Sequence, residues 1–132
     1  MQPPETGAIE LPFATLWIDD GGILCTISNN NKRTIEGMKT VMDVYKNLTK
    51  GKGGEKFCLL SDITNVGPIN RETRIYLGRE LPKYIKAAAS ISQSPMGRML
   101  ANVFLGLGTT TFPAKVFSNE KNAREWLMQF NN

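Results

Sequence analysis

The side chains best suited to chemistry lie in one segment, FCLLSDITNVGPINRETR, residues 57–74. An apolar run ends there in a polar loop, and a helix start follows. We take six of its polar residues as candidates for binding a partner or ligand: Asp62, Thr64, Asn70, Arg71, Glu72 and Arg74. The two arginines are three positions apart, so a helix would place them on one face, where they can receive an anion or an acidic patch. A structural interpretation stays open, in which Asp62 satisfies loop amides and the arginines face solvent.

The composition argues against several kinds of catalysis. The chain contains no histidine, which removes the commonest general base and the Ser-His and Cys-His nucleophile pairs. Cys25 and Cys58 lie in separate apolar runs, are too few for a structural zinc cage, and are expected to be buried thiols. Asp19 and Asp20 precede two glycines and are expected to shape a hairpin turn, although with Asp62 they are a conceivable metal site. We therefore expect that the protein is not an enzyme and that it binds neither a metal nor a cofactor.

Charge and hydropathy also limit the possible partners. The net charge of +4 comes from scattered basic residues, without the interleaved aromatic side chains of a nucleic-acid groove, so no specific nucleic acid is expected. The glycine-rich residues 51–56 follow a helix and precede a strand, which is the wrong context for a phosphate loop. No apolar window reaches the length of a membrane span, and residues 1–12 lack the features of a signal peptide. We expect a cytoplasmic protein in which residues 1–12 form a flexible extension.

The hydrophobic periodicity predicts the elements that position the polar segment. Strands are predicted at 13–19, 23–28, 57–60, 83–92 and 113–118, and helices at 34–51, 70–80 and 95–107 and after a cap at Ser118. Residues 83–92 are ambiguous because alanines favour helix, but their period of two favours a strand. The order β-β-α-β-α-β-α-β-α predicts one α/β domain over residues 13–132, with a mostly parallel sheet that begins in a hairpin.

The predicted helix 95–107 is more apolar than a surface helix requires. Packing on the sheet explains it most simply. The alternative is an exposed apolar face that forms a homodimer or touches a lipid surface.

The order of elements, with the runs LLSDITNV and PINRET, resembles the STAS domain, the fold of the SpoIIAA-like anti-sigma-factor antagonists. The resemblance covers the chain from about Phe13. Arg74 with Tyr76, SPMGR at 94–98 and FSNEKNAREWL at 117–127 are similar to a group of small, uncharacterised bacterial SpoIIAA-like proteins.

The resemblance implies a regulatory corner, but one altered at its centre. In the switch members of the family, a strand ends in Asp, an aliphatic residue and Ser or Thr, and the next helix begins with Asp-Ser-Ser-Gly, where a partner kinase phosphorylates a serine. Residues 62–64 match the first part, whereas residues 70–73 lack the serines. Thr73 is the remaining phosphorylation candidate, one residue late. Glu72 either supplies a permanent negative charge there or favours the helix start.

These observations lead to two main hypotheses of different classes, with nonspecific nucleic-acid binding as a third and weaker one. The first is a non-enzymatic, STAS-like regulatory module that binds another protein through the segment 62–74 in a signalling or stress-related pathway. The second is a carrier that holds a small molecule or lipid within the same fold.

Overall fold

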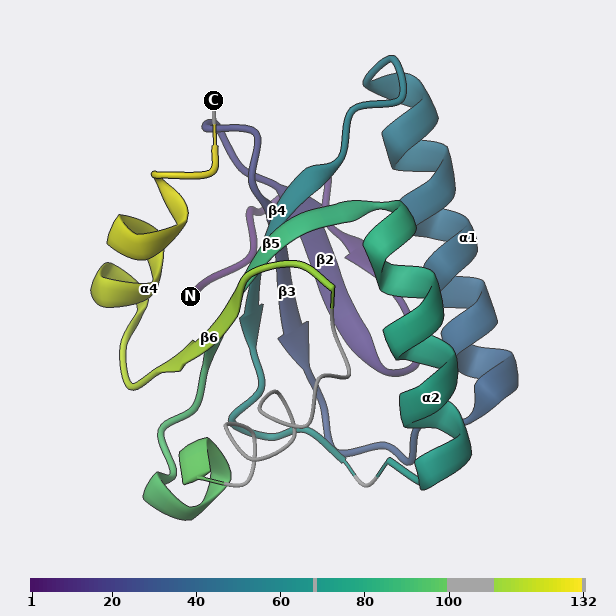
Figure 1. Ribbon diagram of the computed structural model, residues 1–132, viewed down its shortest axis with the longest axis vertical. Coiled ribbons are helices and arrows are strands. Elements are labelled where there is room, and N and C mark those ends of the chain that lie inside the picture. The colour runs from purple at the N-terminus through teal and green to yellow at the C-terminus, as the bar shows by residue number, and fades with distance from the viewer. Residues whose placement is uncertain (68, 100–110, 132) are drawn as a thin grey trace.

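The structure is a computed structural model that describes residues 1–67, 69–99 and 111–131. Its centre is a six-stranded sheet in the order β1-β2-β3-β4-β5-β6 (Figure 1). The strands are β1 (Ile9–Glu10), β2 (Ala14–Ile18), β3 (Leu24–Ser28), β4 (Phe57–Asp62), β5 (Ile85–Ile91) and β6 (Ala114–Phe117). The pairs β1/β2 and β2/β3 are antiparallel, and β3 to β6 are parallel. The predicted parallel sheet with a hairpin at its start is confirmed.

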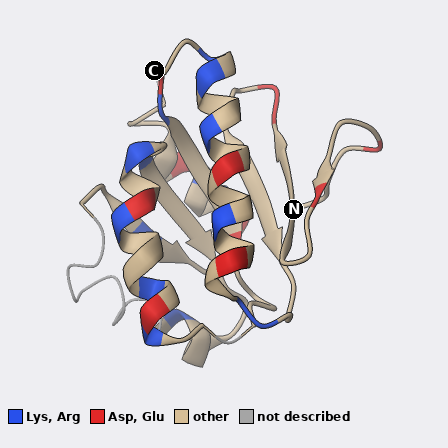
Figure 2. Ribbon diagram, turned by 90° about the vertical axis from the view of Figure 1, so that its right-hand side faces the viewer, with Lys and Arg blue, Asp and Glu red and all other residues tan. Residues whose placement is uncertain are grey.

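Helices cover both faces of this sheet. α1 (Ile35–Gly51) and α2 (Arg71–Glu80), followed by the 3-10 turn η1 (Leu81–Lys83), lie on one face, and α4 (Glu120–Leu127) lies on the other (Figure 1). α1 and α2 run side by side, with charged residues of both signs along them (Figure 2). Residues 95–99 are helical as predicted, but the rest of the helix expected at 95–107 lies outside the described residues. The alternative of a homodimer contact through this helix therefore stays untested.

Two details of the sequence prediction differ from the structure. The strand β1 was not predicted, because two residues are too few to show a period; it pairs with β2 and brings part of the segment 1–12 into the sheet. The cap of α4 was predicted one residue early. Asn119, not Ser118, is the N-cap, because its side-chain oxygen accepts a hydrogen bond from the Asn122 amide at 2.9 Å.

The hairpin between β2 and β3 confirms the turn role predicted for Asp19. Its carboxylate accepts hydrogen bonds from the Gly21 and Ile23 amides, both at 2.9 Å. Gly22 has a φ of 80°, which favours glycine. The same carboxylate accepts a hydrogen bond from Arg124 at 2.7 Å, which ties α4 to the hairpin.

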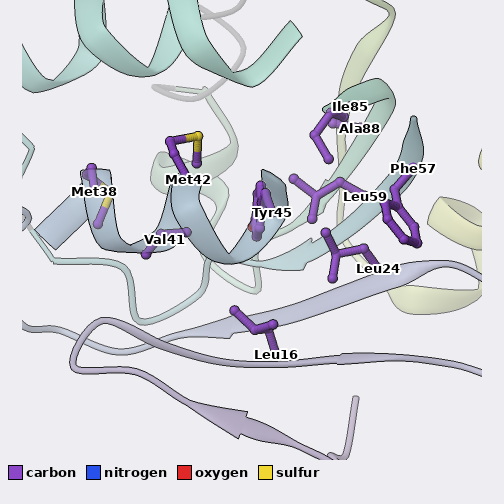
Figure 3. Packing of buried hydrophobic residues seen from close by; sticks show 10 residues of the cluster. All are labelled: Leu16, Leu24, Met38, Val41, Met42, Tyr45, Phe57, Leu59, Ile85 and Ala88. Atoms are coloured by element: carbon purple, nitrogen blue, oxygen red, sulfur yellow. The ribbon is translucent and has the colours of Figure 1, made fainter. Parts of the chain in front are cut away.

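Two buried clusters hold the layers together, one on each face of the sheet. Between the sheet, α1 and α2 lie ten residues (Figure 3): Leu16, Leu24, Met38, Val41, Met42, Tyr45, Phe57, Leu59, Ile85 and Ala88. Between the sheet and α4 lie Trp17, Ile23, Cys25, Cys58, Leu60, Ala87, Ala89, Ile91, Ala123 and Leu127. Both cysteines are buried free thiols, as predicted. Burial and then the nearby Asp19 carboxylate raise the pKa of Cys25 to about 12, so its thiol stays protonated at neutral pH.

Candidate functional site

Three of the predicted site residues form local hydrogen bonds that shape the corner between β4 and α2. The Asp62 carboxylate accepts from the Thr64 amide at 3.0 Å. The Thr64 hydroxyl accepts from the Gln93 amide at 3.2 Å, which ties this loop to the segment after β5. Asn70 caps α2 by accepting from the Thr73 amide at 2.8 Å. The structure therefore agrees with the structural interpretation of Asp62, in which the carboxylate satisfies a loop amide.

The other predicted residues separate into different environments. Arg71 and Glu72 are exposed at the start of α2, whereas Arg74 is half-buried and lines a cavity. Thr73, the phosphorylation candidate, has no exposed surface, and its hydroxyl has no hydrogen-bond partner among the described residues. A kinase cannot reach a hydroxyl in this position unless the start of α2 opens.

The cavity lies between the sheet and the two helices α1 and α2, and its volume is about 620 Å³. Side chains of both helices and of strands β2 to β6 line it, together with the loop after β4. Val66 and Ser94 are exposed residues that also line it, so the cavity reaches the surface at the carboxyl ends of the parallel strands. This is the edge at which open α/β sheets commonly bind ligands.

The sheet face of the cavity changes from apolar to polar along the strands. Strand pairing aligns one apolar row across β3 to β6: Leu24, Leu59, Ala88 and Ala114. Two residues further along, the aligned row is Thr26, Ser61, Ser90 and Val116. Successive rows on one face are roughly 7 Å apart, because each residue advances a strand by about 3.3 Å. The floor of the cavity is therefore apolar at one end and rich in hydroxyl groups toward the carboxyl edge.

The hydroxyl row retains unused hydrogen-bonding capacity. Thr26 donates to Ser61 across the β3/β4 pair at 2.9 Å. The side chain of Ser90 in this row, and that of Ser28 two residues beyond Thr26 on β3, make no hydrogen bond with any residue of the described ranges, and both line the cavity. A polar group of a ligand can bind to these hydroxyls at the carboxyl edge.

Arg33 is a cavity residue that the sequence analysis missed. It lies just before α1 and is only 4% exposed. Its two terminal nitrogens donate to the carbonyls of Phe13, Asn29 and Asn31 at 2.6–2.8 Å, so the side chain holds the segments before β2 and α1 together. No sequence signal identified it, because a single arginine in a polar segment is typical of a solvated surface.

The charged side chains in the described lining of the cavity are both positive. Arg33 and Arg74 are the charged residues among the described lining, which includes no Asp or Glu. Within the described part of the chain, no carboxylate forms an ion pair with Arg33. Burial lowers the pKa of Arg33 from its ordinary value, although an arginine remains charged at neutral pH. The cavity thus combines an apolar interior with two cations at its polar end.

This arrangement suits binding. In residues 1–67, 69–99 and 111–131 no three metal-ligating side chains come together, and no helix there is long and apolar enough to cross a membrane. The cavity lining described above supplies hydroxyls, apolar side chains and two guanidinium groups. Groups of these types are those that line binding sites for molecules with an apolar body and a polar end.

Comparisons with known proteins agree with the architecture. A comparison with curated protein sequences found no match. Among solved structures, the chain is similar to an uncharacterised protein of the DUF3478 family from Shewanella loihica PV-4, which has a SpoIIAA-like fold. The TM-score is 0.65 with 19% sequence identity, over 96% of this chain and 98% of that one. The likeness confirms the predicted SpoIIAA-like fold. Residues 16–131 match the family described as "Domain of unknown function (DUF7793)", and the chain belongs to that family.

Proposed function

We propose that this protein is a non-enzymatic binding module that holds a small amphipathic molecule between the sheet and the helices α1 and α2. The observation that carries the proposal is the cavity of about 620 Å³, whose lining is mostly apolar with hydroxyl groups at one end. Ligand pockets in proteins commonly have volumes of about 300–1,000 Å³ and a similar lining. The proposal favours the carrier hypothesis over the protein-binding one and keeps the cytoplasmic location expected from the sequence.

The first test is to look for a bound molecule and then to block the cavity. Protein purified under native conditions is analysed by native mass spectrometry for a co-purifying ligand. It is then unfolded, stripped, refolded and titrated with phenylnaphthylamine, an uncharged dye that fluoresces in apolar sites. We expect saturable binding to the stripped protein.

Two substitutions test whether the dye binds in the cavity. Ala88→Leu adds three carbons within the apolar row and should weaken dye binding about tenfold or more, because it occupies ligand volume. Thr40→Leu adds a leucine on the exposed side of α1 and should leave binding unchanged. Absence of binding to stripped wild-type protein, or equal binding by Ala88→Leu and wild type, would contradict the proposed function.

A regulatory, protein-binding role is the second candidate, supported by the outer surface of α2. Arg71 and Glu72 are exposed at its start, and Ile75 is 54% exposed one turn later. An apolar side chain beside charged ones is a combination found at protein interfaces. A partner that binds wild type and Ala88→Leu but not Arg71→Glu or Ile75→Asp would support this role, and a partner lost only in Ala88→Leu would contradict it.

A further inference from the structure

The cation Arg33 is the starting point for a more specific statement about the ligand. Its side chain is buried, lines the cavity and has no carboxylate partner in the described ranges. Buried charges in proteins are normally paired, because an isolated charge loses its hydration on burial. The three carbonyl contacts compensate part of that loss, but a carbonyl carries only a partial charge.

The guanidinium group also keeps donors available. Arginine has five N–H donors, and the carbonyl contacts use three of them, all on the terminal nitrogens. The Nε–H group forms no hydrogen bond with a described residue. Arg33 is therefore held in place by one part of its side chain while another part can still donate.

Neighbouring groups increase the preference for a negative charge. Arg74 lines the same cavity from α2, and the described lining includes no acidic residue that would oppose an anion. The unused hydroxyls of Ser28 and Ser90 supply further donors toward the carboxyl edge. The far end of the cavity is apolar and includes Leu59 and Ala88.

We infer that the cavity selects an anionic amphiphile, with a carboxylate, sulfonate or phosphate group toward Arg33 and the serine hydroxyls and an apolar tail along Leu59 and Ala88. This inference rests on the proposed function, because it assigns the charge and orientation of the ligand in the same cavity. The positive charge of Arg33 then has the counter-ion that the described protein does not supply.

The test compares two probes that share an apolar body and differ in charge. Anilinonaphthalene sulfonate is anionic, and phenylnaphthylamine is its uncharged parent. Stripped wild-type protein should bind the sulfonate about tenfold more tightly than the parent, since a charge-assisted hydrogen bond is worth about 1.5–3 kcal/mol, which converts to tenfold or more. Ala88→Leu should weaken the binding of both probes, and this result would show that both occupy the cavity.

Three arginine variants separate the site from the general positive charge of the protein. Arg33→Gln and Arg74→Gln should remove most of the preference for the sulfonate and leave the affinity for the parent within about twofold. Arg71→Gln makes the same charge change at an exposed position of α2 and should leave the preference intact. An equal loss in Arg71→Gln, or an unchanged preference in the other two, would overturn the inference.

Arg33→Gln removes three hydrogen bonds that hold two segments together, so a measurement on the wild-type protein is also needed. The Nε–H resonance of Arg33 in nitrogen-proton NMR spectra should shift on saturation with the sulfonate and stay in place with the parent. A resonance that stays in place with both bound probes would overturn the inference while leaving the proposed function standing. Failure of both probes to bind would instead contradict the proposed function.

Discussion

The two faces of the sheet are built from the same strands but are packed differently. On the α4 face, seven of the ten core residues have no exposed surface, and they include small side chains such as Ala87, Ala89 and Ala123. On the α1/α2 face, Leu59 and Ala88 each retain 8% exposure, and the hydroxyl row lies beside the cavity. The difference is consistent with the proposed function, in which one face stabilises the fold and the other leaves room for the proposed ligand.

The largest expected effect comes from truncating a leucine on the closely packed face. Leu60→Ala should lower the free energy of unfolding by about 3–5 kcal/mol, because Leu60 is fully buried and the space cannot refill. Leu59→Ala, its neighbour on the cavity face, should cost about 2 kcal/mol, because part of its surface already faces the cavity. Urea unfolding of both variants measures the difference, and equal costs would break the comparison between the faces.

Adding volume should also cost more stability on the α4 face than on the cavity face. Ala89→Leu inserts a larger side chain against α4 and should destabilise the protein by about 2–3 kcal/mol. Ala88 lines the cavity, so the larger side chain of Ala88→Leu has space there. This substitution should change the stability by less than about 1 kcal/mol. Thermal unfolding of the stripped proteins tests this pair. A strongly destabilised Ala88→Leu variant would mean that the cavity is not available space.

The ion pair that joins α4 to the hairpin predicts a pH dependence. Burial raises the pKa of Asp19, but hydrogen bonds from Arg124, Ile23 and Gly21 outweigh it and bring the pKa below its ordinary value of 3.8. Its contribution to stability is therefore present above that value and is lost as the pH falls through the lower, folded-state pKa. Asp19→Asn should cost roughly 1–2 kcal/mol at pH 7 and much less in strong acid.

The matched control for that variant is Asp20→Asn, in the same turn. Asp20 forms no ion pair or side-chain hydrogen bond within the described ranges. Its substitution should change the stability little at either pH. Urea unfolding at both pH values checks the pair, and a cost of Asp19→Asn that does not vary with pH would contradict the assigned role.

The smallest effect is expected at Thr73, a fully buried residue of α2. Its hydroxyl is buried and has no partner in the part of the chain that the structure describes, so Thr73→Val removes an unsatisfied polar group and nearly preserves the shape. We expect a gain of about 1 kcal/mol in the free energy of unfolding, measured with urea. Thr73→Ser keeps the hydroxyl and loses a buried methyl group, so it should be less stable than wild type. A loss in Thr73→Val would mean that the hydroxyl has a partner.

Local patterns along the chain were sufficient to predict most of the fold. The period of two in residues 83–92 correctly predicted β5 despite its alanines, because opposite faces of that strand pack against different layers. Asn70 was correctly identified as the cap of α2, since capping depends on residues that are close in sequence. Strand β1 was missed because its two residues are defined by pairing with β2 and not by their own pattern.

The sequence by itself determined the order of the elements, the caps and turns, and the absence of histidine chemistry, because each of these depends on residue types over short distances. Only the tertiary structure decided which polar residues share a site. Strand pairing aligned Thr26, Ser61 and Ser90 from three separate segments, and packing buried Arg33 in the lining of the same cavity. It also separated Arg74 from the exposed Arg71. The physical reason is that a cavity is space left between packed layers, and the positions of those layers depend on contacts between residues far apart in the chain.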